Sequence, residues 1–169
     1  MQVFPSGLSP WIMVTGASSG IGEVFVRRFA QMKANLILVA RSTDKLMKLS
    51  SDIERSFGVR TLILANDLCS ENSPLSIFEE VRKKVIQLYG LVNNAGCGAG
   101  GKFVDVSRER YLNMIDLNVR ALVELTHLFL PGMIKRKRGF IINVSSTASF
   151  LPLPYSSVYS ASKAFVTFF

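Results

Sequence analysis

The chain has 169 residues, of which 49% are hydrophobic and 19% charged, with a net charge of +8 and an isoelectric point near 9.8. This length suits one domain with a buried core and is too short for two ordinary domains. The apolar runs are strand-sized and the N-terminus has no basic stretch before an apolar run, which argues against a transmembrane helix and a secretory signal. We therefore expect a single domain, residues 1–169, in the cytoplasm.

The densest basic run is KRKR at residues 135–138. It follows a helical pattern, so its cations suit the negative end of a helix dipole. A nucleic-acid or anionic-membrane surface is the alternative, but no recognition helix or aromatic RNA-binding motif accompanies the run, and no nucleic acid is expected. Cys69 and Cys97 have no His or Cys neighbour at metal-ligand spacing, so we expect reduced, structural thiols and no metal site.

Short β-rich runs alternate with amphipathic stretches along the whole chain. The expected strands are residues 11–15, 35–40, 60–65, around 91–92, and 140–144. The expected helices are residues 19–32, 43–57, 74–88, 107–137 with a break near Asn118, and a last helix from about Ser157. Ser73 before Pro74, and Ser107, are predicted N-caps. The alternation predicts an α/β fold, a doubly wound parallel sheet of about five strands with helices on both faces.

The first strand is followed by the sequence TGASSGIG, residues 15–22. Gly16, Gly20 and Gly22 are spaced more widely than in G-x-G-x-x-G, but they can serve the same purposes. These are a tight turn, close approach of the backbone to a pyrophosphate, and close helix packing. The following helix also presents free amides to a phosphate. A plain strand-to-helix turn is the alternative.

Four later motifs follow the glycine turn in a regular order: residues 93–96 (NNAG), Asn118, Ser146, and Tyr159-x-x-x-Lys163. Their order and separations resemble those of the short-chain dehydrogenases/reductases, over residues 11–169. The resemblance implies a Rossmann-like sheet that lacks the last strands of the family fold. The residues expected to bind the cofactor are Gly16, Ser18, Ser19, Gly20, Ile21, Gly22, Arg41, Asp67, Asn94, Ala95, Gly96, Tyr159 and Lys163.

Tyr159 resembles the family's proton donor or acceptor at the substrate oxygen. A phenol ionises at about pH 10 in water, so it needs a nearby cation to transfer a proton near neutrality. Lys163 lies one helical turn later on the same face and can supply that charge. In the family the equivalent lysine also holds the nicotinamide ribose, Asn118 matches the asparagine that positions the lysine through water, and Ser146 matches the serine at the substrate oxygen. Ser145 is adjacent, but the spacing to Tyr159 favours Ser146. Each residue also has a purely structural interpretation.

The cofactor preference is predicted from the end of the second strand. An acid there would bind the ribose 2′-hydroxyl and repel a 2′-phosphate. This chain has Arg41 instead, a bidentate partner for phosphate, so we expect NADP(H) rather than NAD(H). The alternative is an Arg41 that only caps the sheet edge. Asp67 resembles the family's adenine-contacting aspartate, or it simply begins a loop.

Family members normally continue beyond the helix of Tyr159 and Lys163, so the chain is expected to be C-terminally truncated relative to them. Two functions follow. One is an NADP(H)-dependent oxidoreductase that interconverts a carbonyl and an alcohol; the other is a catalytically incomplete remnant that binds a dinucleotide or serves as an association module. Steroid, sugar, fatty-acyl and small-ketone carbonyls all remain open as substrates. The resemblance also implies a homodimer or homotetramer.

Overall fold

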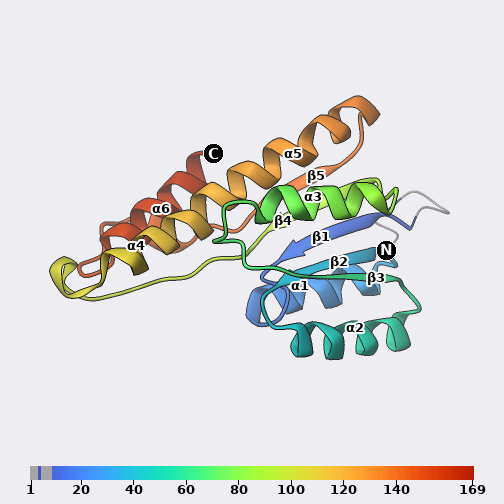
Figure 1. Cartoon of the computed structure of the whole chain (residues 1–169), viewed down its shortest axis with the longest axis horizontal. Coiled ribbons are helices and arrows are strands. Elements are labelled where there is room, and N and C mark those ends of the chain that lie inside the picture. The colour runs from blue at the N-terminus through green and yellow to red at the C-terminus, as the bar shows by residue number, and fades with distance from the viewer. Residues whose placement is uncertain (1–3, 5–8) are drawn as a thin grey trace.

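The computed structural model describes Phe4 and residues 9–169. At its centre is a five-stranded sheet whose neighbouring strands are all parallel, in the order β3-β2-β1-β4-β5 (Figure 1). The strands are β1 (Trp11–Thr15), β2 (Asn35–Ala40), β3 (Thr61–Ala65), β4 (Leu88–Asn93) and β5 (Phe140–Asn143). The helices are α1 (Gly20–Gln31), α2 (Thr43–Phe57), α3 (Ser73–Lys83), α4 (Arg108–Ile115), α5 (Ala121–Arg136) and α6 (Ser157–Phe168). The predicted doubly wound parallel sheet is confirmed.

Helices cover both faces of the sheet (Figure 1). On one face α1 and α2 pack on Leu36 and Leu38 of β2, and on the other face α3 and α5 pack with Ile37 and Val39 of the same strand. All four of these β2 residues are fully buried. A strand covered on both faces is apolar throughout rather than alternating, which is why β2 reads as a continuous hydrophobic run.

Helix α3 differs from its predicted bounds at both ends. The helix ends at Lys83 instead of extending to Leu88, which is the first residue of β4. Val85 takes a left-handed conformation with φ of 54°, so the chain leaves the helix there and turns back to the sheet. At the other end, Asn72 and not Ser73 is the N-cap residue, and the buried Ser73 hydroxyl has no hydrogen-bond partner among the described residues.

Helices α4 and α5 form one long helical segment instead of two helices separated by a break (Figure 1). Ser107 caps α4 as predicted, because its hydroxyl accepts a hydrogen bond from the Arg110 N–H at 3.3 Å. A single π turn, Asp116–Arg120, joins the two helices and places Asn118 in the interior. Such turns are rare and frequently lie at functional sites.

The basic run of residues 135–138 lies at the end of α5, as predicted. The helix ends at Arg136, and Lys137 follows in the left-handed conformation. The Arg136 guanidinium donates to the Leu88 carbonyl at 2.7 Å, so this cation binds the chain's own backbone. In the described part of the chain, no helix is both long and apolar enough to cross a membrane.

The carboxyl ends of all five strands lie along one edge of the sheet, because the strands are parallel. The strand order changes direction between β1 and β4, which are neighbours in the sheet. Ligands of such sheets bind outside the carboxyl ends at this switch point. The glycine turn, the segment after β4 and the segment after β5 all begin here.

Candidate active site

A cavity of about 470 Å³ lies at this carboxyl edge. Its walls are the turn between β1 and α1, the loops after β2 and β3, and the segment after β4. The predicted cofactor-binding residues that line it are Gly16, Ser18, Ser19, Ile21, Arg41, Asp67, Asn94, Ala95 and Gly96. Gly20 and Gly22 do not line the cavity. A larger hollow of about 1100 Å³ lies at the opposite edge, around Arg60 and Tyr89, and contains none of the predicted site residues.

The glycine turn is held against β4 by Thr15, the last residue of β1. Its hydroxyl oxygen accepts hydrogen bonds from the N–H groups of Asn94 and Ala95, at 3.0 and 2.9 Å, and donates to the Val92 carbonyl. The Asn94 amide in turn donates to the Thr15 carbonyl at 2.9 Å. These bonds join the two segments that form the centre of the cavity, a role for Thr15 that the sequence analysis did not assign.

Within the turn, Gly16 and Gly20 have φ of 66° and 55°, the left-handed region that favours glycine. The Ser19 hydroxyl at the N-cap makes no capping hydrogen bond within the described chain. The N-terminal amides of α1 are therefore without that side-chain cap next to the cavity, and such a helix end attracts anions.

Two cations, Arg41 and Lys45, line the end of the cavity formed by the loops after β2 and β3. Arg41 follows β2 directly and is exposed, as the predicted phosphate partner would be. Lys45 lies in the first turn of α2, four residues after Arg41, and was missed because no motif marks it. The other lining residues missed by the sequence analysis are Ala40, Ser42, Asn66, Leu68 and Leu117.

The π turn positions Asn118 between two segments of the site. The Asn118 side chain accepts a hydrogen bond from the Cys97 N–H at 2.9 Å and donates to the Cys97 carbonyl at 3.0 Å. It also donates to the Ser162 hydroxyl at 2.9 Å, and that hydroxyl donates to the Tyr159 carbonyl. Asn118 thus connects the segment after β4 with α6, one residue before Lys163.

Lys163 is buried, and its ammonium group donates to the Val144 carbonyl at 2.8 Å. A Cβ atom on Gly96 would lie 3.3 Å from the Lys163 Nζ and 3.2 Å from the Asn118 Oδ1. Gly96 therefore lies at the point where the cavity meets the predicted catalytic residues. Burial lowers the pKa of Lys163 from its ordinary value of 10.5, partly offset by the nearby Cys97 thiol.

This lowered pKa predicts how stability depends on pH. At a pH below the folded-state pKa, Lys163 is charged in both the folded and the unfolded protein, and the full cost of burying this charge lowers the free energy of unfolding. As the pH rises through the folded-state pKa towards 10.5, the folded protein loses this proton first, so the penalty is relieved. We expect the free energy of unfolding of the unchanged protein to rise relative to Lys163→Met over this range.

The measurement is urea unfolding followed by circular dichroism at a series of pH values. Lys48→Met, which removes an exposed cation from α2, is the matched control and should show no comparable rise. A constant difference between unchanged protein and Lys163→Met at every pH would contradict the prediction.

Tyr159 lies one helical turn before Lys163 on α6 and is half-buried. Its ring lies beside the segment after β4, since a Cβ added at Gly98 would be 3.4 Å from it. It also packs on the buried cluster that contains Tyr111 and Met114. The described contacts therefore support the ring on two sides.

The two neighbouring serines differ in their contacts. The Ser145 hydroxyl donates to the Lys163 carbonyl at 2.9 Å and also bonds to the Thr167 hydroxyl, so it binds α6. The Ser146 oxygen accepts only from the Ala148 N–H, at 3.2 Å, among the described groups. Its own proton is left to donate, as a contact to a substrate oxygen requires. This difference supports the choice of Ser146 over Ser145.

Known proteins share this architecture. The family model described as short chain dehydrogenase matches residues 10–169. The very-long-chain 3-oxoacyl-CoA reductase of Homo sapiens is 36% identical, and the match covers 96% of this chain and 53% of that protein. The chain therefore spans about half the length of such relatives.

Solved structures agree with this assignment. The short-chain dehydrogenase from Sphingobium yanoikuyae in complex with NADPH has a TM-score of 0.89 at 34% identity, over 94% of this chain and 62% of that one. L-sorbose reductase from Gluconobacter frateurii, complexed with NADPH and L-sorbose, has a TM-score of 0.89 at 33% identity, over 95% of this chain and 61% of that one. The fold, the glycine turn and the family match together show that the chain belongs to the short-chain dehydrogenase family.

Proposed function

We propose that this protein is an NADP(H)-dependent oxidoreductase that interconverts a carbonyl and an alcohol. The observation that carries the proposal is the continuity of the site at Gly96. This residue lines the cavity and approaches both the Lys163 ammonium and the Asn118 amide oxygen. A nicotinamide cofactor bound along the cavity would supply or accept the hydride. Solved relatives that are complexed with NADPH support the choice of cofactor.

The residues of the cavity fit a dinucleotide that carries an extra phosphate. At Gly16 a Cβ would lie 2.8 Å from the Asn94 amide nitrogen, so glycine is needed for the turn to pack this closely on the segment after β4, as a glycine-rich phosphate-binding turn requires. Arg41 and Lys45 supply two positive charges beside the loop after β2. Among the described lining residues Asp67 is the one acid, and it lies after β3 rather than after β2, where an acid would favour a ribose hydroxyl.

The reacting carbonyl would lie beside α6. Tyr159 would donate the proton to the carbonyl oxygen or remove it from the alcohol, and Ser146 would hold the same oxygen through its free hydroxyl proton. Lys163 would hold its charge close to the phenol. The substrate class follows from the relatives: 3-oxoacyl-CoA reductase and L-sorbose reductase both act on carbonyl compounds, and we infer a carbonyl substrate for this protein.

A cofactor titration tests the proposal. Binding is measured by nicotinamide fluorescence. We expect it to be saturable, with higher affinity for NADPH than for NADH. Arg41→Ala should weaken NADPH binding by about tenfold or more, the value of a lost charge-assisted hydrogen bond, and leave NADH binding nearly unchanged. Lys45→Ala should have a smaller effect in the same direction. Lys48→Ala, an exposed cation one helical turn beyond Lys45, is the matched control.

Equal affinities of the unchanged protein for NADPH and NADH, or an Arg41→Ala variant whose preference for NADPH is undiminished, would refute the phosphate-binding role. A folded protein that binds neither cofactor would instead support the second candidate, an association module. Exposed apolar side chains near α6 favour that alternative: Phe150 is 73% exposed and Phe168 is 89% exposed. The cytoplasmic location and the homodimer or homotetramer stay predictions.

A further inference from the structure

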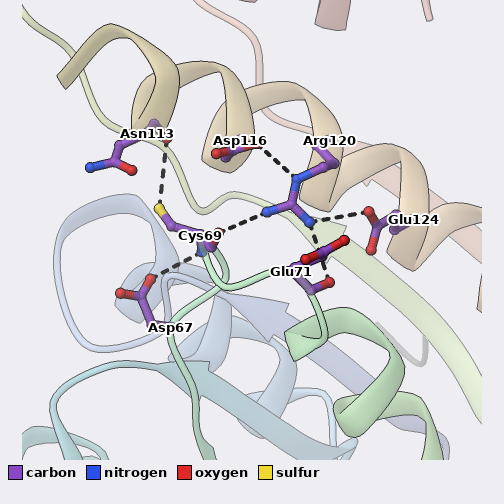
Figure 2. A network of polar contacts seen from close by, with 7 residues as sticks. All are labelled: Asp67, Cys69, Glu71, Asn113, Asp116, Arg120 and Glu124. Carbon is purple, nitrogen blue, oxygen red and sulfur yellow. Dashed lines mark hydrogen bonds and ion pairs between the residues drawn. The ribbon is translucent and has the colours of Figure 1, made fainter. Parts of the chain in front are cut away.

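Arg120, the last residue of the π turn, connects the helical segment of α4 and α5 with the loop between β3 and α3 (Figure 2). Its Nη2 donates to the Cys69 carbonyl at 2.7 Å, and its Nη1 approaches the Glu71 carbonyl at 3.4 Å. Both carbonyls belong to the loop between β3 and α3. On its own helical segment, Arg120 pairs with Asp116 at 2.8 Å and with Glu124 at 3.2 Å. Its guanidinium is thus shared between the loop and the π turn.

The loop is attached to the helical segment at a second point as well. The Cys69 thiol lies 3.6 Å from the Asn113 carbonyl of α4, and the Cys69 N–H donates to the Asp67 carboxylate at 3.0 Å (Figure 2). Burial, followed by the charge of Asp67, raises the pKa of the Cys69 thiol to about 11, so the thiol stays neutral and contributes no charge here. Arg120 is therefore the charged contact between loop and helix.

The loop and the π turn that Arg120 connects both contribute residues to the lining of the cavity. Asp67 and Leu68 come from the loop, and Leu117 comes from the π turn, three residues before Arg120. Arg41 and Lys45 line the same cavity. Arg120 hydrogen-bonds both to the loop that contributes Asp67 and Leu68 and to the helical segment that contributes Leu117.

We propose that Arg120 is a positioning residue that holds the loop of residues 66–72 against the π turn and so sets the width of the pocket for the adenosine half of the dinucleotide. This inference rests on the proposed function for the identity of the ligand. Arginine suits the position because its planar guanidinium donates in several fixed directions, here to two carbonyls and two carboxylates. Lysine could neutralise the carboxylates but could not span all four acceptors.

The test compares two ligands, NADPH and 2′,5′-ADP, which carries only the adenosine half. We expect Arg120→Lys and Arg120→Met to weaken both ligands by the same factor, about tenfold, because the loss lies in the shared half. Arg55→Met is the matched control, since Arg55 pairs with Asp52 within α2, and it should bind both ligands like the unchanged protein. Arg120→Lys keeps a positive charge between Asp116 and Glu124, so it serves if Arg120→Met fails to fold.

Unchanged affinity for 2′,5′-ADP in Arg120→Lys would overturn the proposal, even if NADPH binding fell, because the defect would then lie at the nicotinamide end. Amide hydrogen exchange gives a readout without any ligand: exchange of residues 66–72 should become faster in Arg120→Lys and not in Arg55→Met. Unaltered exchange would overturn the proposal that Arg120 holds this loop. If the unchanged protein binds neither ligand, the proposed function fails, and hydrogen exchange still decides whether Arg120 holds the loop.

Discussion

Replacing Tyr159 by phenylalanine is expected to lower the rate of carbonyl reduction by about 10²–10⁴-fold, the usual contribution of a positioned acid or base. The substitution removes one hydroxyl and keeps the ring that packs on the segment at Gly98 and on the cluster around Tyr111. Lys163 keeps its bond to the Val144 carbonyl. NADPH affinity should therefore stay close to that of the unchanged protein.

The measurement is NADPH oxidation with a panel of ketones and 3-oxoacyl thioesters, together with NADPH titration of each variant. Tyr155→Phe is the matched control, because it removes the same hydroxyl from a side chain that is 65% exposed just before α6. Turnover that survives in Tyr159→Phe would exclude Tyr159 as the proton donor. A parallel loss of NADPH binding would show that the substitution disturbed the site rather than the chemistry.

Replacing Gly22 by alanine is expected to destabilise the protein by about 3 kcal/mol, at the upper end of the usual cost of overpacking. A Cβ there would lie 2.1 Å from the Gly16 carbonyl oxygen and 2.6 Å from the Asn94 amide nitrogen, and the first of these neighbours is backbone that cannot rotate away. Gly22 lies inside α1, where helix propensity alone favours alanine by about 1 kcal/mol. Overpacking would lower the free energy of unfolding, whereas helix propensity would raise it. The sign of the measured change therefore shows which of the two dominates.

Gly20→Ala is the comparison within the same turn. Nothing lies within 4 Å of a Cβ at Gly20, and only its φ of 55° opposes alanine, at a cost of about 1 kcal/mol. Guanidinium unfolding of both variants measures the difference. If Gly22→Ala proved no less stable than Gly20→Ala, the turn would have room for a side chain that the close contacts at Gly22 do not show.

Several elements could be predicted from the sequence because their signals are local. Helix α2 matches its predicted bounds, since its apolar residues recur at helical spacing and Gly58 ends it in the left-handed conformation. Strand β2 also matches, because six consecutive residues contain five buried ones between two turns. The predicted end of α3 was wrong. The apolar Ile86 and Leu88 continue a helical pattern in the sequence, but the helix ends at Lys83 and Leu88 belongs to β4.

The residues of the candidate site could be predicted where a sequence motif marks them. They were harder to predict where contacts between distant segments place a residue in the site. Nine predicted cofactor residues line one cavity, because each lies at or near the carboxyl end of a strand. Lys45 was missed because no motif marks it. The hydrogen bonds of Arg120 join it to Glu71 and Cys69, which are 49 and 51 positions away in the sequence. Such pairs have no local spacing rule.

Hydrophobic periodicity and glycine turns act over a few neighbouring residues, so the alternation of strands and helices, the parallel sheet and the order of the motifs could be predicted from the sequence. The tertiary structure was needed to show that Ser145 binds α6 while the Ser146 proton is left to donate, and that Asn118 lies in a π turn. It also showed Lys163 buried beside Gly96. The physical reason is that side-chain hydrogen bonds and burial depend on which distant segments the fold brings together.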